Sequence, residues 1–154
     1  MPQDRTKGGD AITGLLLVTF RLNGNFLEAA DRISAPSNLT AARWQILGSV
    51  LQEAKTVSQI AREMGLARQS VQRIANILVG EGHLELTENP AHKRAKLITV
   101  TQQGRASIYS LSERQHIWAN TIAEGFDSQE LALAVQLLRR VSSQLEAMEK
   151  TPTK

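Results

Sequence analysis

The chain has 154 residues, which is enough for one domain, alone or with an appended dimerisation arm. Hydrophobic residues make up 42% and charged residues 21%, so the chain can bury a core, and only 4% aromatic residues favours helices over a sheet sandwich. Lys and Arg outnumber Asp and Glu by 18 to 15, a mild excess that permits an anionic partner. The absence of cysteine excludes disulfides, thiolate zinc sites and thiol catalysis.

Apolar residues recur at helical spacing from about Gly9 to Ile33, which predicts a long first helix that ends before Pro36. The longest continuous apolar run, Leu15 to Val18, is too short to span a membrane. The basic residues ahead of it resemble a secretion signal only loosely, because no small-residue cleavage site follows. We therefore expect a cytoplasmic protein that makes no contact with a membrane.

A second helix is predicted after Thr40, a typical N-cap residue, with Trp44 at the edge of its apolar face. That face would contain Leu39, Ile46, Leu47, Val50 and Leu51. Two shorter helices follow over 58–64 and 68–79, with Gly65 between them. Together they have the spacing of a helix-turn-helix, in which the small, flexible and apolar positions are Ala61, Gly65 and Val71.

The hydrophobic period changes to two at Leu84–Thr87 and again over 97–101, which predicts a β-hairpin around the turn-rich segment 89–94. Helical spacing returns beyond Gly104, and Asp127 or Ser128 would cap a last helix. That helix has a coiled-coil pattern of apolar residues, formed by Leu131, Val135, Leu138 and Leu145. The predicted fold class is therefore mainly α with a small antiparallel hairpin.

The apolar stripes of the first and last helices predict a homodimer, because one chain could not cover both. The alternative is that the first helix packs on the last within a single chain. We assign 9–35 and 106–150 to a helical dimerisation region and 39–104 to the helix-turn-helix lobe. Residues 1–8 and 151–154 are expected to be flexible tails.

The outer face of the helix over 68–79 carries only side chains that can donate hydrogen bonds, namely Arg68, Gln69, Ser70, Gln72, Arg73 and Asn76. In the major groove, Arg pairs with guanine and Gln or Asn pairs with adenine, and a helix of this kind fits that groove. The alternative is an ordinary surface helix with a polar outer face.

The hairpin carries Lys93, Arg94 and Lys96 near its tip. Such a wing can place cations along the DNA backbone and insert one arginine into the minor groove. The alternative is a solvated hairpin whose charges prevent aggregation at its edge. The charge distribution favours DNA, since residues 56–105 contain seven Lys or Arg and four Asp or Glu and so account for the whole net charge of +3.

At these residues the chain resembles the MarR (multiple antibiotic resistance regulator) family of winged helix-turn-helix transcriptional regulators. The resemblance spans nearly the whole length and is most specific in the wing, Asn89-Pro-Ala-His-Lys-Arg-Ala-Lys-Leu-Ile-Thr-Val-Thr101 followed by Gly104. Leu39-Thr-Ala-Ala-Arg-Trp-Gln-Ile-Leu47 and the helix-turn-helix also carry it. It implies an obligate homodimer with interleaved terminal helices and two winged lobes that bind double-stranded DNA.

The resemblance assigns Arg94 to the minor groove and places Arg68, Gln69, Ser70, Gln72 and Arg73 on the groove-facing part of the recognition helix. Three positions depart from the family pattern. His92 replaces an aspartate that braces the wing arginine, Leu86 replaces an arginine, and Ala67 replaces a helix-capping residue. These departures bear on affinity and on the preorganisation of the wing, which His92 could make sensitive to pH near 6.5.

The resemblance also implies a small effector, often aromatic and anionic, between the dimer helices and the lobe. By position, the candidates for its pocket are Phe20, Arg43, Trp44 and Trp118, which combine flat apolar walls with one cation. The alternative is that these aromatic residues belong to the core.

The sequence thus predicts a transcriptional repressor that binds a pseudo-palindromic operator as a homodimer and is released when an effector changes the spacing of its recognition helices. The alternative is a winged-helix module for protein–protein contact or scaffolding without operator specificity. We expect no enzyme, metal or cofactor, because His83, His92 and His116 lack metal-ligand spacing and no nucleotide-binding glycine motif is present.

Overall fold

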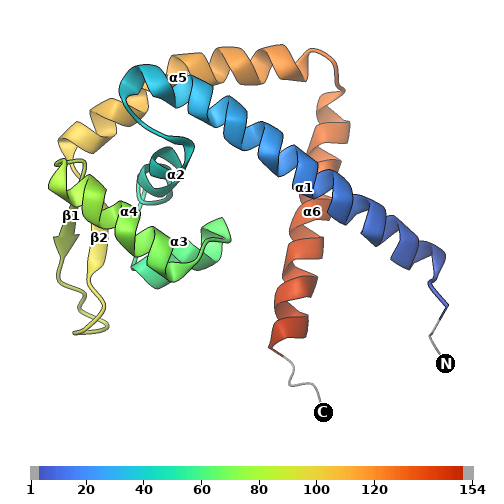
Figure 1. The fold of residues 1–154 in the computed structure, drawn as a ribbon, viewed down its shortest axis with the longest axis horizontal. Helices are drawn as coiled ribbons and strands as arrows, with labels where there is room; N and C mark the ends of the chain where they lie inside the picture. The colour runs from blue at the N-terminus through green and yellow to red at the C-terminus, as the bar shows by residue number, and fades with distance from the viewer. Residues whose placement is uncertain (1–3, 151–154) are drawn as a thin grey trace. The chain divides into compact units, whose positions relative to one another are not determined.

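The protein is mainly helical, with a two-stranded antiparallel hairpin, in a computed structural model that describes residues 4–150 (Figure 1). This confirms the predicted fold class. In chain order the elements are α1 (Lys7–Ser34), the short 3-10 helix η1 (Ala35–Ser37), α2 (Ala41–Ser49), α3 (Val57–Met64), α4 (Arg68–Gly80), β1 (Leu84–Thr87), β2 (Leu97–Val100), α5 (Gln102–Ala123) and α6 (Ser128–Glu149).

By its internal contacts the chain divides into two compact units, residues 1–113 and 114–154, and the boundary falls inside α5. Helix α1 therefore belongs to the same unit as the helix-turn-helix. The functional division of the chain into a dimerisation region (9–35 and 106–150) and a DNA-binding lobe (39–104) concerns an assembly of two chains, and it stays a prediction.

Helix α1 begins earlier than the sequence pattern indicates. Thr6 Oγ1 accepts a hydrogen bond from Gly9 N at 3.0 Å, so Lys7 and Gly8 are helical and do not belong to an N-terminal tail. Residues 1–3 and 151–154 of the expected tails lie outside the described residues. The helix ends at Ser34, at the predicted break, and η1 follows it and ends at Asn38, which has a left-handed φ of 54°.

The core of the first unit lies between α2, α4 and the hairpin. Helix α2 packs on α1, α3 and α4, and α4 packs on β1. The largest fully buried apolar side chains come from α2 and its C-cap, α3, α4, the two strands and α5, and none of them comes from α1. They are Ile46, Leu47, Val50, Ile60, Val71, Leu78, Leu84, Ile98 and Leu111. Of the five apolar positions that the sequence assigns to the α2 face, four belong to the core, and Leu51 is half-buried.

The helix-turn-helix is closed by two local devices. Thr56 and Gln59 form a capping box at the start of α3, in which each side chain bonds the other residue's backbone N–H. Gly65 ends α3 with φ of 63°, a conformation that glycine adopts without strain. These devices fix where α4 starts relative to α3.

The hairpin pairs Leu84 with Val100 and Thr87 with Leu97, and a further bridge joins Lys55 to Ile98. Lys55 N donates to Ile98 O at 3.2 Å, and Ile98 N donates to Lys55 O at 2.8 Å. Strand β2 is therefore held on one side by β1 and on the other by the residue before the α3 cap. The wing is fixed at its root to the helix-turn-helix.

Gly104 allows α5 to approach the hairpin closely. A Cβ at this position would overlap the carbonyl oxygen of His83 and lie 2.8 Å from Val100 Cγ2. Thr101 Oγ1 accepts from Gly104 N at 3.1 Å and bonds Gly82 O at 2.6 Å, so α5 starts at Gln102, before the predicted position.

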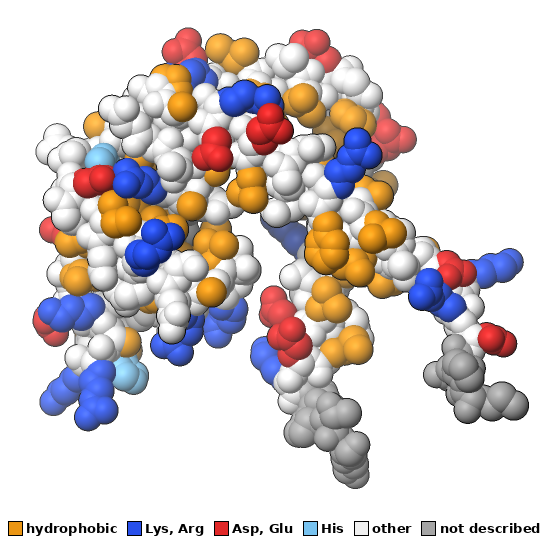
Figure 2. Space-filling view, viewed as in Figure 1, with side chains coloured by type: hydrophobic (Ala, Val, Ile, Leu, Met, Phe, Trp, Pro, Cys, Tyr) orange, Lys and Arg blue, Asp and Glu red, His pale blue; other side chains and the backbone are white. Residues whose placement is uncertain are grey.

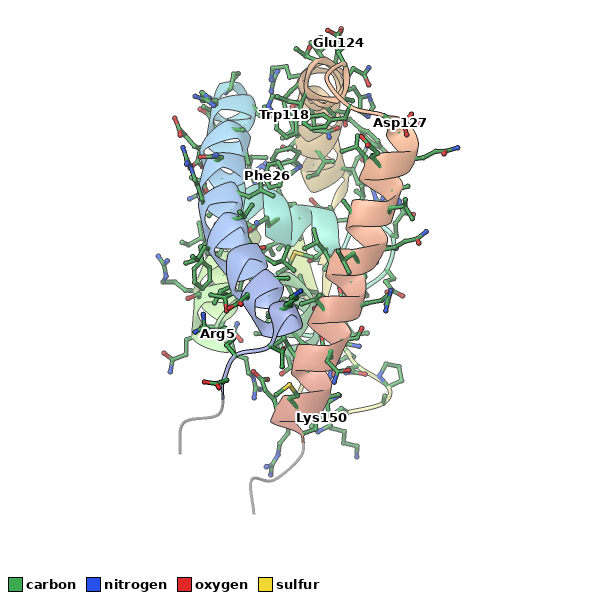
Figure 3. The ribbon with its side chains drawn as sticks, turned by 90° about the vertical axis from the view of Figure 1, so that its right-hand side faces the viewer. Arg5, Phe26, Trp118, Glu124, Asp127 and Lys150 are labelled. Atoms are coloured by element: carbon green, nitrogen blue, oxygen red, sulfur yellow. The ribbon has the colours of Figure 1, made fainter. Side chains whose placement is uncertain are left out.

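In the second unit, Asp127, one of the two candidates that the sequence indicates, is the N-cap of α6 and accepts from Gln129 N and Glu130 N. Figure 3 shows the helix running from Asp127 to Lys150. None of the described residues of α6 is buried, although the helix carries a regular series of apolar side chains.

Candidate nucleic-acid interface

Helix α4 presents a polar outer face, as predicted. Arg68, Gln69, Gln72, Arg73 and Asn76 are exposed, whereas the opposite side of the helix is buried. Ser70 differs from the other candidates, because it lies half-buried at the edge of the face. The side chains available to a ligand in front of α4 are therefore two arginines and three amides.

A groove of about 470 Å³ lies between α4 and the hairpin. Its lining contains three cationic side chains and no acid, and it is formed by Thr56, Val57, Ser58, Arg68, Gln69, Gln72, Leu86, Arg94, Ala95, Lys96 and Ile98. The structure thus brings together residues that the sequence assigns separately to the recognition helix and to the wing. Arg73, Asn76 and Lys93 are exposed beside the groove without lining it.

The start of α3 is a part of the groove that sequence reasoning missed. Thr56, Val57 and Ser58 line it. Hydroxyl groups and backbone N–H groups at a helix start commonly bind phosphate. The Thr56–Gln59 capping box was readable as a helix start in the sequence, but only the folded chain shows that this start faces the wing.

The tip of the hairpin is organised by Asn89. Its Nδ2 donates to Ala95 O at 2.8 Å, and its Oδ1 accepts from Ala91 N at 3.0 Å. Turns at His92 and Ala95 follow, with His92 N bonded to Asn89 O and Ala95 N bonded to His92 O. One side chain therefore braces the segment that displays Lys93 and Arg94.

The cations of the wing differ in whether an acidic side chain already pairs with them. Figure 2 shows Lys and Arg side chains gathered at the tip of the hairpin. Lys96 Nζ lies 3.6 Å from Glu88 Oε1, so Lys96 is partly neutralised. Within residues 4–150, neither Lys93 nor Arg94 has an acidic partner. Arg94 is thus the groove-lining cation of the wing that is free to meet an anion.

Comparison with known proteins identifies the family. A model of the MarR family matches residues 37–95, which include the helix-turn-helix and most of the wing. The uncharacterised protein Rv2011c of Mycobacterium tuberculosis is 37% identical over 138 residues, which cover 90% of this chain and 96% of that protein. The chain belongs to the MarR family.

Solved structures of other proteins have the same fold. CouR from Rhodococcus jostii RHA1, bound to p-coumaroyl-CoA, gives a TM-score of 0.74 at 22% identity and covers 92% of this chain and 95% of its own. A mutant MarR from E. coli complexed with operator DNA gives 0.73 at 21% identity, covering 86% and 96%. BldR from Sulfolobus solfataricus gives 0.79 at 15% identity, covering 90% and 99%.

The three departures from the MarR pattern have visible consequences. Ala67 occupies the N-cap of α4 and makes no side-chain capping bond. Leu86 lines the groove and is 44% exposed, so an apolar side chain faces the groove at a position where the family pattern has a cation. His92 is exposed at the wing tip, where Asn89 supplies the bracing hydrogen bonds.

Lys55 lies at the root of this MarR wing but is not a free cation. Its Nζ lies 2.6 Å from Glu63 Oε2 and 3.7 Å from Glu53 Oε1. The hydrogen bond to Glu63 raises the pKa of Lys55 above its ordinary value. The charge of Lys55 therefore ties the root of the wing to α3.

The four residues expected to form an effector pocket are not gathered within one unit. Phe20, Arg43 and Trp44 belong to the first unit and Trp118 to the second. Phe20 is exposed on α1, and Trp44 is half-buried on α2. Arg43 Nη1 lies 3.1 Å from the Glu81 carboxylate, so the cation proposed for an effector already has a partner. The pocket stays a prediction.

Within residues 4–150, no cluster of three or more His, Cys, Asp or Glu side chains could hold a metal ion. Over the same residues, no helix is both long and apolar enough to cross a membrane.

Proposed function

We propose that this MarR-family chain is a homodimeric transcriptional repressor that binds a pseudo-palindromic operator through α4 and the wing. The observation that carries the proposal is the groove between these elements, whose cations are Arg68, Arg94 and Lys96 and whose lining holds no acid. An anionic polymer is the ligand that such a surface attracts. The solved complex of a MarR mutant with operator DNA, which has the same fold, supports this choice.

In this proposal α4 enters the major groove, and the wing follows the adjacent backbone. Arg68, Gln69, Gln72, Arg73 and Asn76 face the base edges, while Ser70 at the edge of the face is better placed for phosphate. Arg94 enters the minor groove, and Lys93 and Lys96 lie along phosphates. The start of α3 at Thr56 to Ser58 adds neutral phosphate contacts.

Exposed apolar side chains support the homodimer. On α1, Ile12, Leu16 and Phe20 are exposed, and on α6, Leu131, Val135, Leu138 and Leu145 are exposed. Soluble monomers rarely leave large continuous apolar surfaces in water. A second copy would cover them and would place two recognition helices about 34–36 Å apart, one turn of DNA.

An effector completes the proposal. CouR, which has the same fold, is bound to p-coumaroyl-CoA in its solved structure, and this supports a small-molecule ligand here. Such an effector would act by favouring a helix spacing that fits the operator poorly. It can shift binding only by as much as its affinity for the two spacings differs.

The alternative is a protein–protein module without operator specificity. Such a surface would carry acidic or apolar residues in front of α4, whereas the exposed residues of this face are all hydrogen-bond donors. Leu86 is the one feature of the groove that favours the alternative, because it is apolar and 44% exposed. The charged lining of the same groove outweighs it.

Salt titration separates the two functions. The full-length protein would first select duplexes from a random pool. The logarithm of its affinity for these duplexes should fall linearly with the logarithm of the salt concentration, and each phosphate contact should contribute about −0.9 to the slope. Random duplexes should bind at least about a thousandfold more weakly. A protein that shows no preference among duplexes, or an affinity independent of salt, would support the protein–protein module instead.

A further inference from the structure

The centre of the exposed face of α4 holds two amide side chains that are joined to each other. Gln72 Nε2 donates a hydrogen bond to Asn76 Oδ1 at 2.9 Å. The two residues lie four positions apart on the helix, so their side chains are neighbours on the same face, about one turn apart. Gln72 lines the groove, and Asn76 is exposed beside it. This hydrogen bond joins two side chains of the recognition face of α4.

The bond leaves Gln72 with a defined set of free groups. An amide nitrogen carries two hydrogens, of which Asn76 takes one. The second hydrogen and the Oε1 acceptor remain for a ligand. A neighbouring donor and acceptor match the major-groove edge of adenine, which offers the N7 acceptor and the N6 amino donor. Guanine offers two acceptors at that edge and matches one of these groups only.

The bond also restricts the motion of Gln72. A free glutamine samples many rotamers, and this freedom is lost when the side chain binds a base. Asn76 holds the Gln72 amide in the free protein. Part of the conformational entropy of Gln72 is therefore already lost before DNA binds. Gln69, which also lines the groove, has no such partner among the described residues.

We propose that Gln72 reads one adenine in each half of the binding site and that Asn76 is a positioning residue that orients the Gln72 amide for this contact. The inference rests on the proposed function, because it names the base that the same surface recognises. It also assigns different roles to the two residues. Gln72 touches the base, while Asn76 acts through Gln72.

The test uses the full-length protein and a duplex selected from a random pool. In each half-site, one adenine should be sensitive to an analogue that has carbon in place of N7, with binding about ten- to a hundredfold weaker. Gln72→Ala should remove this sensitivity. Asn76→Ala should reduce it by roughly three- to tenfold while Gln72 is still present.

Two further variants separate positioning from other effects. Asn76→Asp keeps the acceptor for Gln72 Nε2 and should retain the discrimination at this adenine, although its negative charge should weaken binding to every duplex alike. Gln69→Ala is the matched control on the same face, and it should leave the sensitivity at this adenine unchanged.

The outcomes distinguish the inference from the function on which it rests. If Asn76→Ala discriminates as well as the wild type, or if no analogue-sensitive adenine exists in a well-bound site, the inference is overturned and the proposed function stands. If the wild type binds no duplex at all, both fall. Loss of discrimination in Gln72→Ala together with its retention in Asn76→Asp supports the pair.

Discussion

The winged lobe and α6 bury their apolar side chains to very different degrees. In the first, Ile46, Leu78 and Ile98 are fully enclosed between α2, α4 and the hairpin. In the second, Leu138 is 39% exposed and Leu145 57% exposed on α6. The winged lobe therefore holds a core of its own, whereas the apolar side chains of α6 stay exposed in the single chain. The proposed dimer would cover them.

The largest expected effect comes from breaking the assembly. Leu138→Asp places a charge in the apolar stripe of α6 and should convert the proposed dimer to a monomer, because the unpaired charge could not be buried. Operator affinity should then fall by roughly a hundred- to ten-thousandfold, since two linked half-site contacts become one. Sedimentation and DNA titration would measure the two effects.

Gln136→Asp is the control for this substitution. Gln136 is exposed on the side of α6 away from the Leu131, Leu138 and Leu145 stripe, so the same charge there should leave mass and affinity nearly unchanged. A Leu138→Asp protein that remains dimeric and binds normally would show that α6 does not hold the assembly together.

The next effect concerns the lobe itself. Gly104→Ala should destabilise the fold by about 3 kcal/mol or more, because its methyl group would overlap the His83 carbonyl oxygen and crowd Val100. Gly48→Ala is the matched control in α2, where an added methyl group meets no atom within 4 Å. It should be neutral or gain up to about 1 kcal/mol. Equal thermal stability of the two variants would contradict the packing at the root of the wing.

A smaller effect is expected at the tip of the wing. Arg94→Ala should weaken DNA binding and reduce the slope of log affinity against log salt by about one unit, because Arg94 is a cation without an acidic partner in the described chain. Arg139→Ala, which removes an exposed arginine from α6, should leave the slope unchanged. An unchanged slope in Arg94→Ala would remove the wing from the interface.

The smallest effect tests the start of the recognition helix. Ala67 has φ of −67° and ψ of 136°, a backbone conformation suited to an N-cap, but it lacks a side chain to accept a hydrogen bond. Ala67→Ser should therefore stabilise the protein by about 1 kcal/mol in chemical unfolding. Ala91→Ser in the wing turn should give no comparable gain, and an equal gain there would argue against a capping effect.

Local signals made much of the fold predictable. Periodicity gave the helices and the hairpin, because each buries one face, and Gly65 and Asp127 are placed by turn and capping chemistry that needs no distant partner. The sequence pattern predicts the starts of α1 and α5 a few residues after their observed positions. Thr6 and Thr101 set them through single hydrogen bonds that leave no trace in the hydrophobic pattern.

The site was less predictable, because its properties depend on residues far apart in the chain. The sequence indicates a recognition helix and a basic wing, but the pairing of Arg43 with Glu81 spans 38 residues. The contribution of Thr56 to Ser58 to the groove appears only when β2 docks beside Lys55. Charge counts also treat Lys96 like Arg94, whereas Glu88 partly neutralises Lys96.

The mass of the protein–DNA complex tests the central claim most directly. Sedimentation of the full-length protein with a short selected duplex should give a complex of two chains and one duplex, at salt concentrations where random duplex stays free. The free protein should already be a dimer. A complex that contains one chain, or a dimer that ignores every duplex even in dilute buffer, would contradict the account.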